Sequence, residues 1–221
     1  LSFLLMITKE GYPYIIVLLI LAVVIRIIGH VSELSILIDC AVIPGLLLLF
    51  CLIFFRDPKR EIPKGKGIFV SPADGKIVQI KSIEDPDIGK ANLVSIFLNV
   101  FNVHVNRTPV GGSISNVQHK KGKFLAAFNH SASDENEQSN IHIHSKEGMI
   151  KVKQIAGLLA RRIRCYVQKG SHLNTGDKLG FIMFGSRVDI ILPVTINLRV
   201  KLGQKVKGGE SIIGKINETK T

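Results

Sequence analysis

The chain has 221 residues, enough for one or two domains, and its 29 lysines and arginines outnumber its 17 aspartates and glutamates, giving a formal charge of +12. This balance favours an anionic partner, either nucleic acid or an anionic lipid surface. Because only 6% of the residues are aromatic and none is tryptophan, there is little surface for base stacking, which argues against nucleic acid.

Two apolar runs lie in the first sixty residues. Residues 12–28 are interrupted only by Arg26, and residues 36–55 carry Asp39 near their start. A helix needs about 17 to 20 apolar residues to cross a membrane, and both runs reach that length. A cleaved signal peptide is one alternative for the first run, but no small-x-small cleavage site follows it and a second span does. Two buried helices of a soluble core are the other alternative. We predict a transmembrane helical hairpin in residues 1–60.

The charges beside these runs predict an orientation. The connecting loop, residues 29–35, has no lysine or arginine, whereas five basic residues follow the second run: Arg56, Lys59, Arg60, Lys64 and Lys66. By the positive-inside rule the loop lies outside and both termini lie in the cytoplasm. The rest of the chain is then held at the cytoplasmic side of the inner membrane, where the basic cluster meets anionic headgroups.

From residue 61 to residue 221 the chain is expected to form one β-rich domain, set off by Pro58 and Pro63. Short β-branched runs alternate with glycine-rich turns, at residues 67–70, 76–83, 93–100, 141–155 and 163–167. Residues 157–162 are expected to form at most one helical turn, and the polar residues 130–140 a mobile loop. The fold class is therefore mainly β.

A weak repeat occurs near the end of the chain. Two glycines six residues apart, Gly170 and Gly176, are echoed by Gly203 and Gly209, and an acidic residue follows each pair. The repeat predicts a pair of hairpins like those of the lipoyl-like barrel-sandwich folds. The lysine setting of a lipoyl or biotinyl carrier is missing, so the repeat predicts shape and not carrier function. The cysteines form no Cys-x-x-Cys pair and no disulfide framework, which favours a reducing compartment.

Several polar residues are candidates for chemistry. Asp74 precedes Gly75, a pair typical of a hairpin turn, and His104 stands among β-branched residues. His142 and His144 share a strand face, but no third ligand is evident at a suitable spacing, so we predict no metal site. A basic run contains Arg161, Arg162 and Arg164, which suits a solvated face or a phosphate contact.

A Gly-Ser pair, Gly185 and Ser186, lies between two apolar runs with strand composition, residues 179–183 and 190–193. Glycine permits unusual backbone angles and leaves the carbonyl before the serine open to approach. A bulge followed by a surface serine is the alternative interpretation of the pair alone.

Five motifs in this order resemble the short bacterial and archaeal branch of the phosphatidylserine decarboxylases, and the resemblance covers nearly the whole chain. The motifs are Phe-Phe-Arg-Asp-Pro at 54–58, Ser-Pro-Ala-Asp-Gly at 71–75, Asn-Val-His-Val-Asn-Arg-Thr-Pro at 102–109, Gln-Ile-Ala-Gly-Leu-Leu-Ala-Arg-Arg-Ile at 154–163 and Phe-Gly-Ser-Arg-Val-Asp at 184–189. Longer members carry Leu-Gly-Ser-Thr at the processing site and two histidines three residues apart. Here Arg107 stands three residues after His104, so the histidine roles of longer members do not transfer directly.

The resemblance implies a self-processing enzyme that converts phosphatidylserine to phosphatidylethanolamine. The Ser186 hydroxyl attacks the Gly185 carbonyl, the chain is cut between 185 and 186, and residue 186 becomes a covalent pyruvoyl cofactor that binds the substrate amine as a Schiff base. The two fragments, 1–185 and 186–221, then form a heterodimer.

By the same resemblance His104 is the general base, and also a candidate proton donor in turnover, with Asp74 orienting it. Arg107, Arg161 and Arg162 are candidates for substrate binding. The alternative function is a non-enzymatic membrane adaptor with a lipoyl-like barrel, but the long heptad-bearing hairpin usual in such adaptors is missing.

Overall fold

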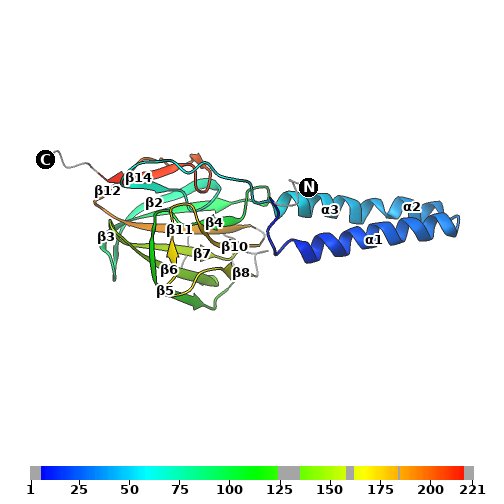
Figure 1. Ribbon diagram of the computed structural model, residues 1–221, viewed down its shortest axis with the longest axis horizontal. Coiled ribbons are helices and arrows are strands. Elements are labelled where there is room, and N and C mark those ends of the chain that lie inside the picture. Colours follow the sequence, from blue (N-terminus) through cyan, green and yellow to red (C-terminus); the bar gives the residue numbers. More distant parts are fainter. Residues whose placement is uncertain (1–5, 124–134, 158–161, 184, 217–221) are drawn as a thin grey trace. The chain divides into compact units, whose positions relative to one another are not determined.

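The computed structural model describes residues 6–123, 135–157, 162–183 and 185–216 (Figure 1). The chain divides into two compact units, Leu1–Lys59 and Arg60–Thr221. Phe184 and Arg161, both named above, lie outside the described residues, as does most of the turn expected at 157–162.

The first unit contains the helices α1 (Tyr12–Val31), α2 (Ser35–Cys40) and α3 (Val42–Phe54), and α1 packs against α3. Only Ala41 separates α2 from α3. The break was not predicted, and Pro44 explains it because proline has no N–H to donate to the carbonyl four residues earlier, that of Cys40. The prediction of two apolar helices is confirmed.

Length and composition suit both helical stretches, Tyr12–Val31 and Ser35–Phe54, for crossing a membrane. Most of their large apolar side chains are exposed; Leu46, for example, keeps 63% of its surface accessible. A continuous apolar surface of this kind is unfavourable in water and suits a hydrocarbon environment.

The described part of the second unit is built from strands, which confirms the mainly β prediction. The strands are β1 (Ile68–Val70), β2 (Gly75–Asp85), β3 (Gly89–Leu98), β4 (Val105–Arg107), β5 (Gly112–Lys120), β6 (Gln138–Ser145), β7 (Gly148–Ile155), β8 (Ile163–Cys165), β9 (His172–Leu173), β10 (Lys178–Ile182), β11 (Ser186–Pro193), β12 (Ile196–Leu198), β13 (Lys205–Val206) and β14 (Ile212–Ile216).

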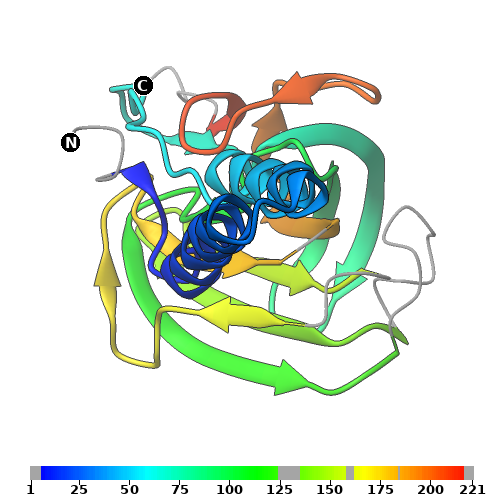
Figure 2. The same ribbon diagram turned by 90° about the vertical axis from the view of Figure 1, so that its right-hand side faces the viewer.

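These strands form three antiparallel sheets. The largest has the order β13-β2-β3-β11-β7-β6-β5-β9 and is strongly curved (Figure 2). The two smaller sheets have the orders β1-β14-β12 and β4-β10-β8. β11 therefore lies inside the large sheet, paired with β3 over eight residues and with β7 over five.

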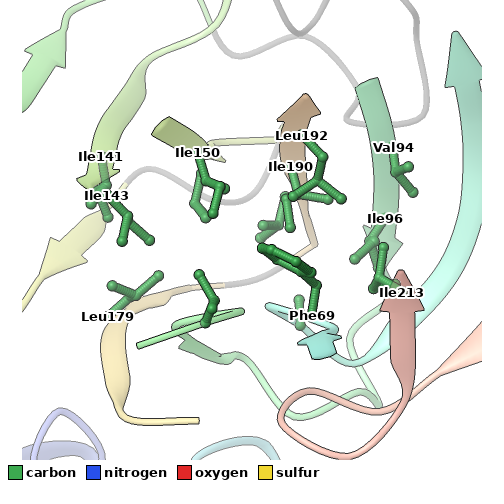
Figure 3. Close-up of a cluster of buried hydrophobic side chains, with 14 of the residues drawn as sticks. Phe69, Val94, Ile96, Ile141, Ile143, Ile150, Leu179, Ile190, Leu192 and Ile213 are labelled. Atoms are coloured by element: carbon green, nitrogen blue, oxygen red, sulfur yellow. The ribbon is translucent and has the colours of Figure 1, made fainter. Parts of the chain in front are cut away.

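The hydrophobic core lies between the large sheet and the two smaller ones. Figure 3 shows apolar side chains of β3, β6, β7 and β11 pointing toward Phe69 of β1, Leu179 of β10 and Ile213 of β14. On β11 the core side chains are Val188, Ile190 and Leu192, every second residue, as expected for a strand with one face on the core. Ser186 belongs to the same alternating set and so starts on the core face.

Two details differ from the sequence prediction. The run 141–155 forms two strands, β6 and β7, joined by a turn before Gly148, whose φ is 113°. Residues 138–140, expected in a mobile loop, belong to β6, where Gln138 pairs with Ile155 across the hairpin; the first half of that predicted loop lies outside the described residues. The lipoyl-like barrel-sandwich arrangement stays a prediction, although the four glycines of the repeat all have φ between 80° and 90°.

Candidate active site

Ser186 begins β11 directly after a turn that only glycine adopts without strain. Gly185 has a φ of 62°, and a Cβ placed there would have no atom within 4 Å, so glycine is favoured for its backbone angles and the approach to its carbonyl stays open. The Ser186 side chain is fully buried, and its Oγ has no hydrogen-bond partner among the described residues. An unpaired buried hydroxyl costs about 1 to 3 kcal/mol. A hydroxyl without a hydrogen-bond partner is available for a chemical role.

His104 is fully buried just before β4, and its main chain joins the strand that leads to the Gly-Ser pair. Its carbonyl accepts a hydrogen bond from Ile182 N at 3.3 Å, at the end of β10. Its Nδ1 lies 2.9 Å from the carbonyl oxygen of Asn102. A carbonyl only accepts, so Nδ1 carries the proton and the lone pair of the neutral ring is on Nε2. This tautomer suits a general base.

Asp74 has partners other than the histidine. Its Oδ1 accepts hydrogen bonds from Arg60 Nη2 and from the main-chain N–H of Gly208, both at 2.8 Å. The position on His104 at which a triad carboxylate usually binds, Nδ1, is taken by the Asn102 carbonyl. The predicted partnership of Asp74 with His104 therefore rests on the resemblance, and the structure adds Arg60 and Gly208 as the groups that fix the carboxylate.

The candidate substrate-binding arginines lie in different settings. Arg107 is buried; its Nη1 donates to the carbonyl of Gly176 at 3.1 Å, and its main-chain N–H donates to the carbonyl of Pro72, two residues before Asp74. Arg162 is exposed, and its carbonyl accepts from Met183 N at 3.2 Å, beside the chain that leads to Gly185. Two of the three arginines thus border the segments that carry Asp74 and Ser186.

Sequence reasoning missed a pair of buried amides. Gln154 on β7 donates from Nε2 to Oδ1 of Asn106 on β4 at 2.8 Å, and both side chains are fully buried. Each amide belongs to one of the motifs described above, at 154–163 and 102–109. Their presence in those motifs was the available signal, but nothing in the sequence indicates that they touch.

A second missed group lies on the opposite face of β11. Arg187 is fully buried and donates from Nε to Asp189 at 2.7 Å, and from Nη2 to Gln79 at 2.7 Å and Ser95 at 2.6 Å. These partners come from β11, β2 and β3. Alternation along the strand places Arg187 away from the core face on which Ser186 lies. The residue after the serine therefore anchors the start of β11 to the two strands beside it.

The histidine pair of β6, His142 and His144, has an acidic and a basic neighbour on the sheet. His142 lies 3.8 Å from Asp87, whose carboxylate also binds Lys151. Burial, and then the positive charge of Lys151, lower the pKa of His142, which favours the neutral ring. Within residues 6–123, 135–157, 162–183 and 185–216, no group of three histidine, cysteine or acidic side chains could hold a metal ion.

A groove of 940 Å³ lies at the far end of the strands from Ser186. It is lined by residues that include Lys66, His144, Lys146 and His172. His144 faces Met149 on β7, whereas the residue of β7 nearest the start of β11 is Ile155, which faces Arg187. The groove is thus separate from the segments that gather around Ser186.

The chain is similar to known proteins of one family. The family model described as phosphatidylserine decarboxylase matches residues 47–214. The chain is 40% identical to the phosphatidylserine decarboxylase proenzyme of Chlorobium limicola over 211 residues, covering 95% of this chain and all of that protein. It is 46% identical to the Chlorobaculum tepidum proenzyme over 76% of this chain and 78% of that protein, and 41% identical to the Geobacter metallireducens proenzyme over 94% and 95%.

The alternative of a non-enzymatic adaptor finds no support in these relatives, all of which are named as decarboxylases. The matched region contains the Gly185–Ser186 pair, His104 and Asp74, so the match covers the candidate site as well as the fold. The chain belongs to the phosphatidylserine decarboxylase family and is a decarboxylase.

Proposed function

We propose that this chain decarboxylates phosphatidylserine by means of a pyruvoyl group made from its own Ser186. The observation that carries the proposal is the buried, unpaired Ser186 Oγ directly after a glycine with φ of 62°. The residues fit such a group, because Ser186 is the first residue of a buried strand and its buried hydroxyl has no hydrogen-bond partner among the described residues. A pyruvoyl group at position 186 would supply a carbonyl able to bind the substrate amine and to accept the electrons left when carbon dioxide departs.

The group would form by a self-cleavage in which His104 is the base. His104 Nε2 takes the proton of Ser186 Oγ, the oxygen attacks the Gly185 carbonyl carbon, and the bond from that carbon to the Ser186 nitrogen breaks. The acyl group is then an ester on Ser186. Loss of the Cα proton expels the Gly185 carboxylate and leaves dehydroalanine, whose imine tautomer is hydrolysed with release of ammonia. The products are the fragments 1–185 and 186–221.

The sheet topology supports a stable heterodimer of these fragments. β11 belongs to the smaller fragment but is bordered by β3 and β7 of the larger one, and β14 of the smaller fragment pairs with β1. Strand pairing and the shared core together would hold the fragments after the peptide bond is cut.

In turnover His104 is the candidate donor of a proton to the substrate carbon, because its ring is buried next to the segment that ends at Ser186. Asp74, whose carboxylate is fixed by Arg60 and Gly208, remains the candidate that the resemblance assigns to orienting His104. Arg107, Arg161 and Arg162 are the candidates for the phosphate of the lipid, since a guanidinium matches phosphate geometry.

Replacing His104 by alanine is expected to accumulate uncleaved precursor, because the base for the serine is lost. Loss of a positioned general base typically slows a reaction by about 10² to 10⁴. Denaturing electrophoresis and intact mass would measure the fraction cleaved, with the wild-type chain, expected as two fragments, as reference. Asp74→Asn should show a milder delay. A His104→Ala chain that matures at the wild-type rate would contradict the assignment of the base.

The substrate stays in a bilayer, and the exposed apolar helices suit a membrane anchor. We propose that the helices cross the inner membrane, with residues 61–221 on the cytoplasmic side against anionic headgroups. The charge difference between the loop at 29–35 and the residues after α3 supports this orientation.

Cysteine labelling in intact cells would test the orientation. In a chain with Cys40, Cys51 and Cys165 replaced by alanine, Ser32→Cys should react with an impermeant thiol reagent, because the loop is exposed and outside. Lys169→Cys, exposed on the second unit, should react only after lysis. The reverse pattern would overturn the cytoplasmic assignment.

A further inference from the structure

The buried amide pair keeps two hydrogen-bonding groups unused. With the bond from Gln154 Nε2 to Asn106 Oδ1 made, Asn106 Nδ2 and Gln154 Oε1 remain buried without a partner among the described residues. Each unpaired buried group costs about 1 to 3 kcal/mol. If the nitrogen and oxygen of both side-chain amides were interchanged, the free donor would belong to Gln154 and the free acceptor to Asn106. The pair therefore offers one donor and one acceptor in either orientation.

The amide pair lies between β10, which precedes the cleavage site in the chain, and β11, which follows it. Asn106 faces Gly180 on β10, and a Cβ at Gly180 would come 2.6 Å from Gln154 Nε2. Gln154 faces Val188 on β11, so its side chain is on the same face of the sheet as Ser186, two residues earlier. The chain passes from β10 to β11 through residues 183–185. The amides thus bridge the two ends of this short connection.

The free donor and acceptor match what an acyl shift from nitrogen to oxygen requires. When Ser186 Oγ attacks, the Gly185 carbonyl oxygen gains negative charge, which an N–H group stabilises. When the carbon–nitrogen bond then breaks, the Ser186 nitrogen takes the proton held by His104 and leaves as an amine. The N–H groups of that amine can donate a hydrogen bond to a carbonyl oxygen. One donor and one acceptor are needed, and one of each is free.

We propose that Asn106 and Gln154 form the hydrogen-bonding site for self-cleavage. Asn106 Nδ2 donates to the Gly185 oxygen in the tetrahedral intermediate, and Gln154 Oε1 accepts from the departing Ser186 amine. The inference rests on the proposed function, since it concerns the step that creates the pyruvoyl group, and it adds two catalytic residues to Ser186 and His104.

Cleavage rates of full-length chains, synthesised without cells in the presence of vesicles with anionic lipids, would test the pair. Asn106→Leu removes the donor and is expected to slow conversion to the two fragments by about 10² to 10³, the usual cost of losing one oxyanion donor. Gln138→Leu is the matched control: Gln138 is also buried with an unpaired Oε1, but it faces Ile155 and so lies on the other face of the sheet. It should cleave at the wild-type rate.

Asn106→Asp separates a catalytic role from a structural one. The variant keeps the size of the side chain, so a structural role predicts a smaller defect than that of Asn106→Leu. A catalytic role predicts the opposite once the carboxyl is ionised, because its charge repels the oxyanion. Burial raises the pKa of such a carboxyl, so the rate relative to wild type should fall as the pH rises from about 5 to 9.

An Asn106→Asp chain that cleaves faster than Asn106→Leu at the upper end of this range, or a ratio that does not change with pH, would overturn the inference. If Asn106→Leu does not fold, as judged by thermal unfolding, the pH profile of Asn106→Asp decides alone. Failure of the proposed function has a different signature, since the wild-type chain would then decarboxylate without being cut between 185 and 186.

Discussion

Ser186→Ala is expected to remain a single uncleaved chain without decarboxylase activity. The replacement removes the only atom that attacks Gly185 in the proposed mechanism, and with it the precursor of the reactive carbonyl. Because the side chain is buried and its Oγ has no partner among the described residues, no hydrogen bond within that part of the chain is lost. The fold should therefore be retained. Intact mass would measure cleavage, thermal unfolding would measure whether the fold is retained, and release of carbon dioxide from phosphatidylserine vesicles would measure activity.

Two companion variants sharpen this result. Ser186→Cys keeps a nucleophile at the same position and should cleave to some extent, since a thiol can accept the acyl group as well. Ser82→Ala removes an exposed serine of β2, far from the cleavage site in the sequence, and should mature normally. An uncleaved Ser186→Ala chain with wild-type activity would contradict the pyruvoyl mechanism.

Arg187→Met is expected to cause the largest loss of stability in the second unit. The guanidinium is fully buried. Without it, Asp189, which is 1% exposed, would lose the cation that neutralises its charge. Breaking a buried ion pair by removing one partner typically costs about 3 to 5 kcal/mol. For a domain of this size each kcal/mol lowers Tm by about 2 to 4 °C. Thermal unfolding of full-length chains in detergent, in the uncleaved Ser186→Ala background, would measure the shift without interference from maturation.

The control for this variant is a pair of further replacements. Arg199→Met removes an exposed arginine and should change stability by no more than about 0.5 kcal/mol. Arg187→Met combined with Asp189→Leu should recover much of the loss, because an apolar pair needs no compensating charge. If Arg187→Met alone unfolds at the same temperature as its parent, the buried cluster does not hold the start of β11.

The features that the sequence predicts well are those set by local pattern. The apolar runs predict α1 and the α2–α3 stretch, because length and hydropathy alone decide whether a helix suits a membrane. The Gly-Ser pair predicts the turn and strand start at Ser186, because a positive φ is a local demand that glycine meets. His104 and Asp74 are proposed as site residues from the same kind of local information, because they belong to short motifs.

The features that the sequence does not predict depend on contacts between distant residues. β5 has few apolar side chains, and its pairing with β6 and β9 makes it a strand. The contact between Asn106 and Gln154 joins positions 48 residues apart. The partner of His104 Nδ1 also differs from the expected carboxylate, because the chain turn places the Asn102 carbonyl within hydrogen-bond distance of the ring. Motifs identify these residues, and only the fold determines which of them meet.

The central place of β11 has a consequence for the stability of the molecule after the proposed self-cleavage. Before the cut, folding is a unimolecular process, and a chain that opens can close again with its own strand still attached. After the proposed cut, complete unfolding would release a peptide of 36 residues, and recovery would become a second-order encounter that dilution opposes. The lifetime of the mature enzyme would therefore depend on its rate of unfolding and not on the equilibrium free energy of unfolding.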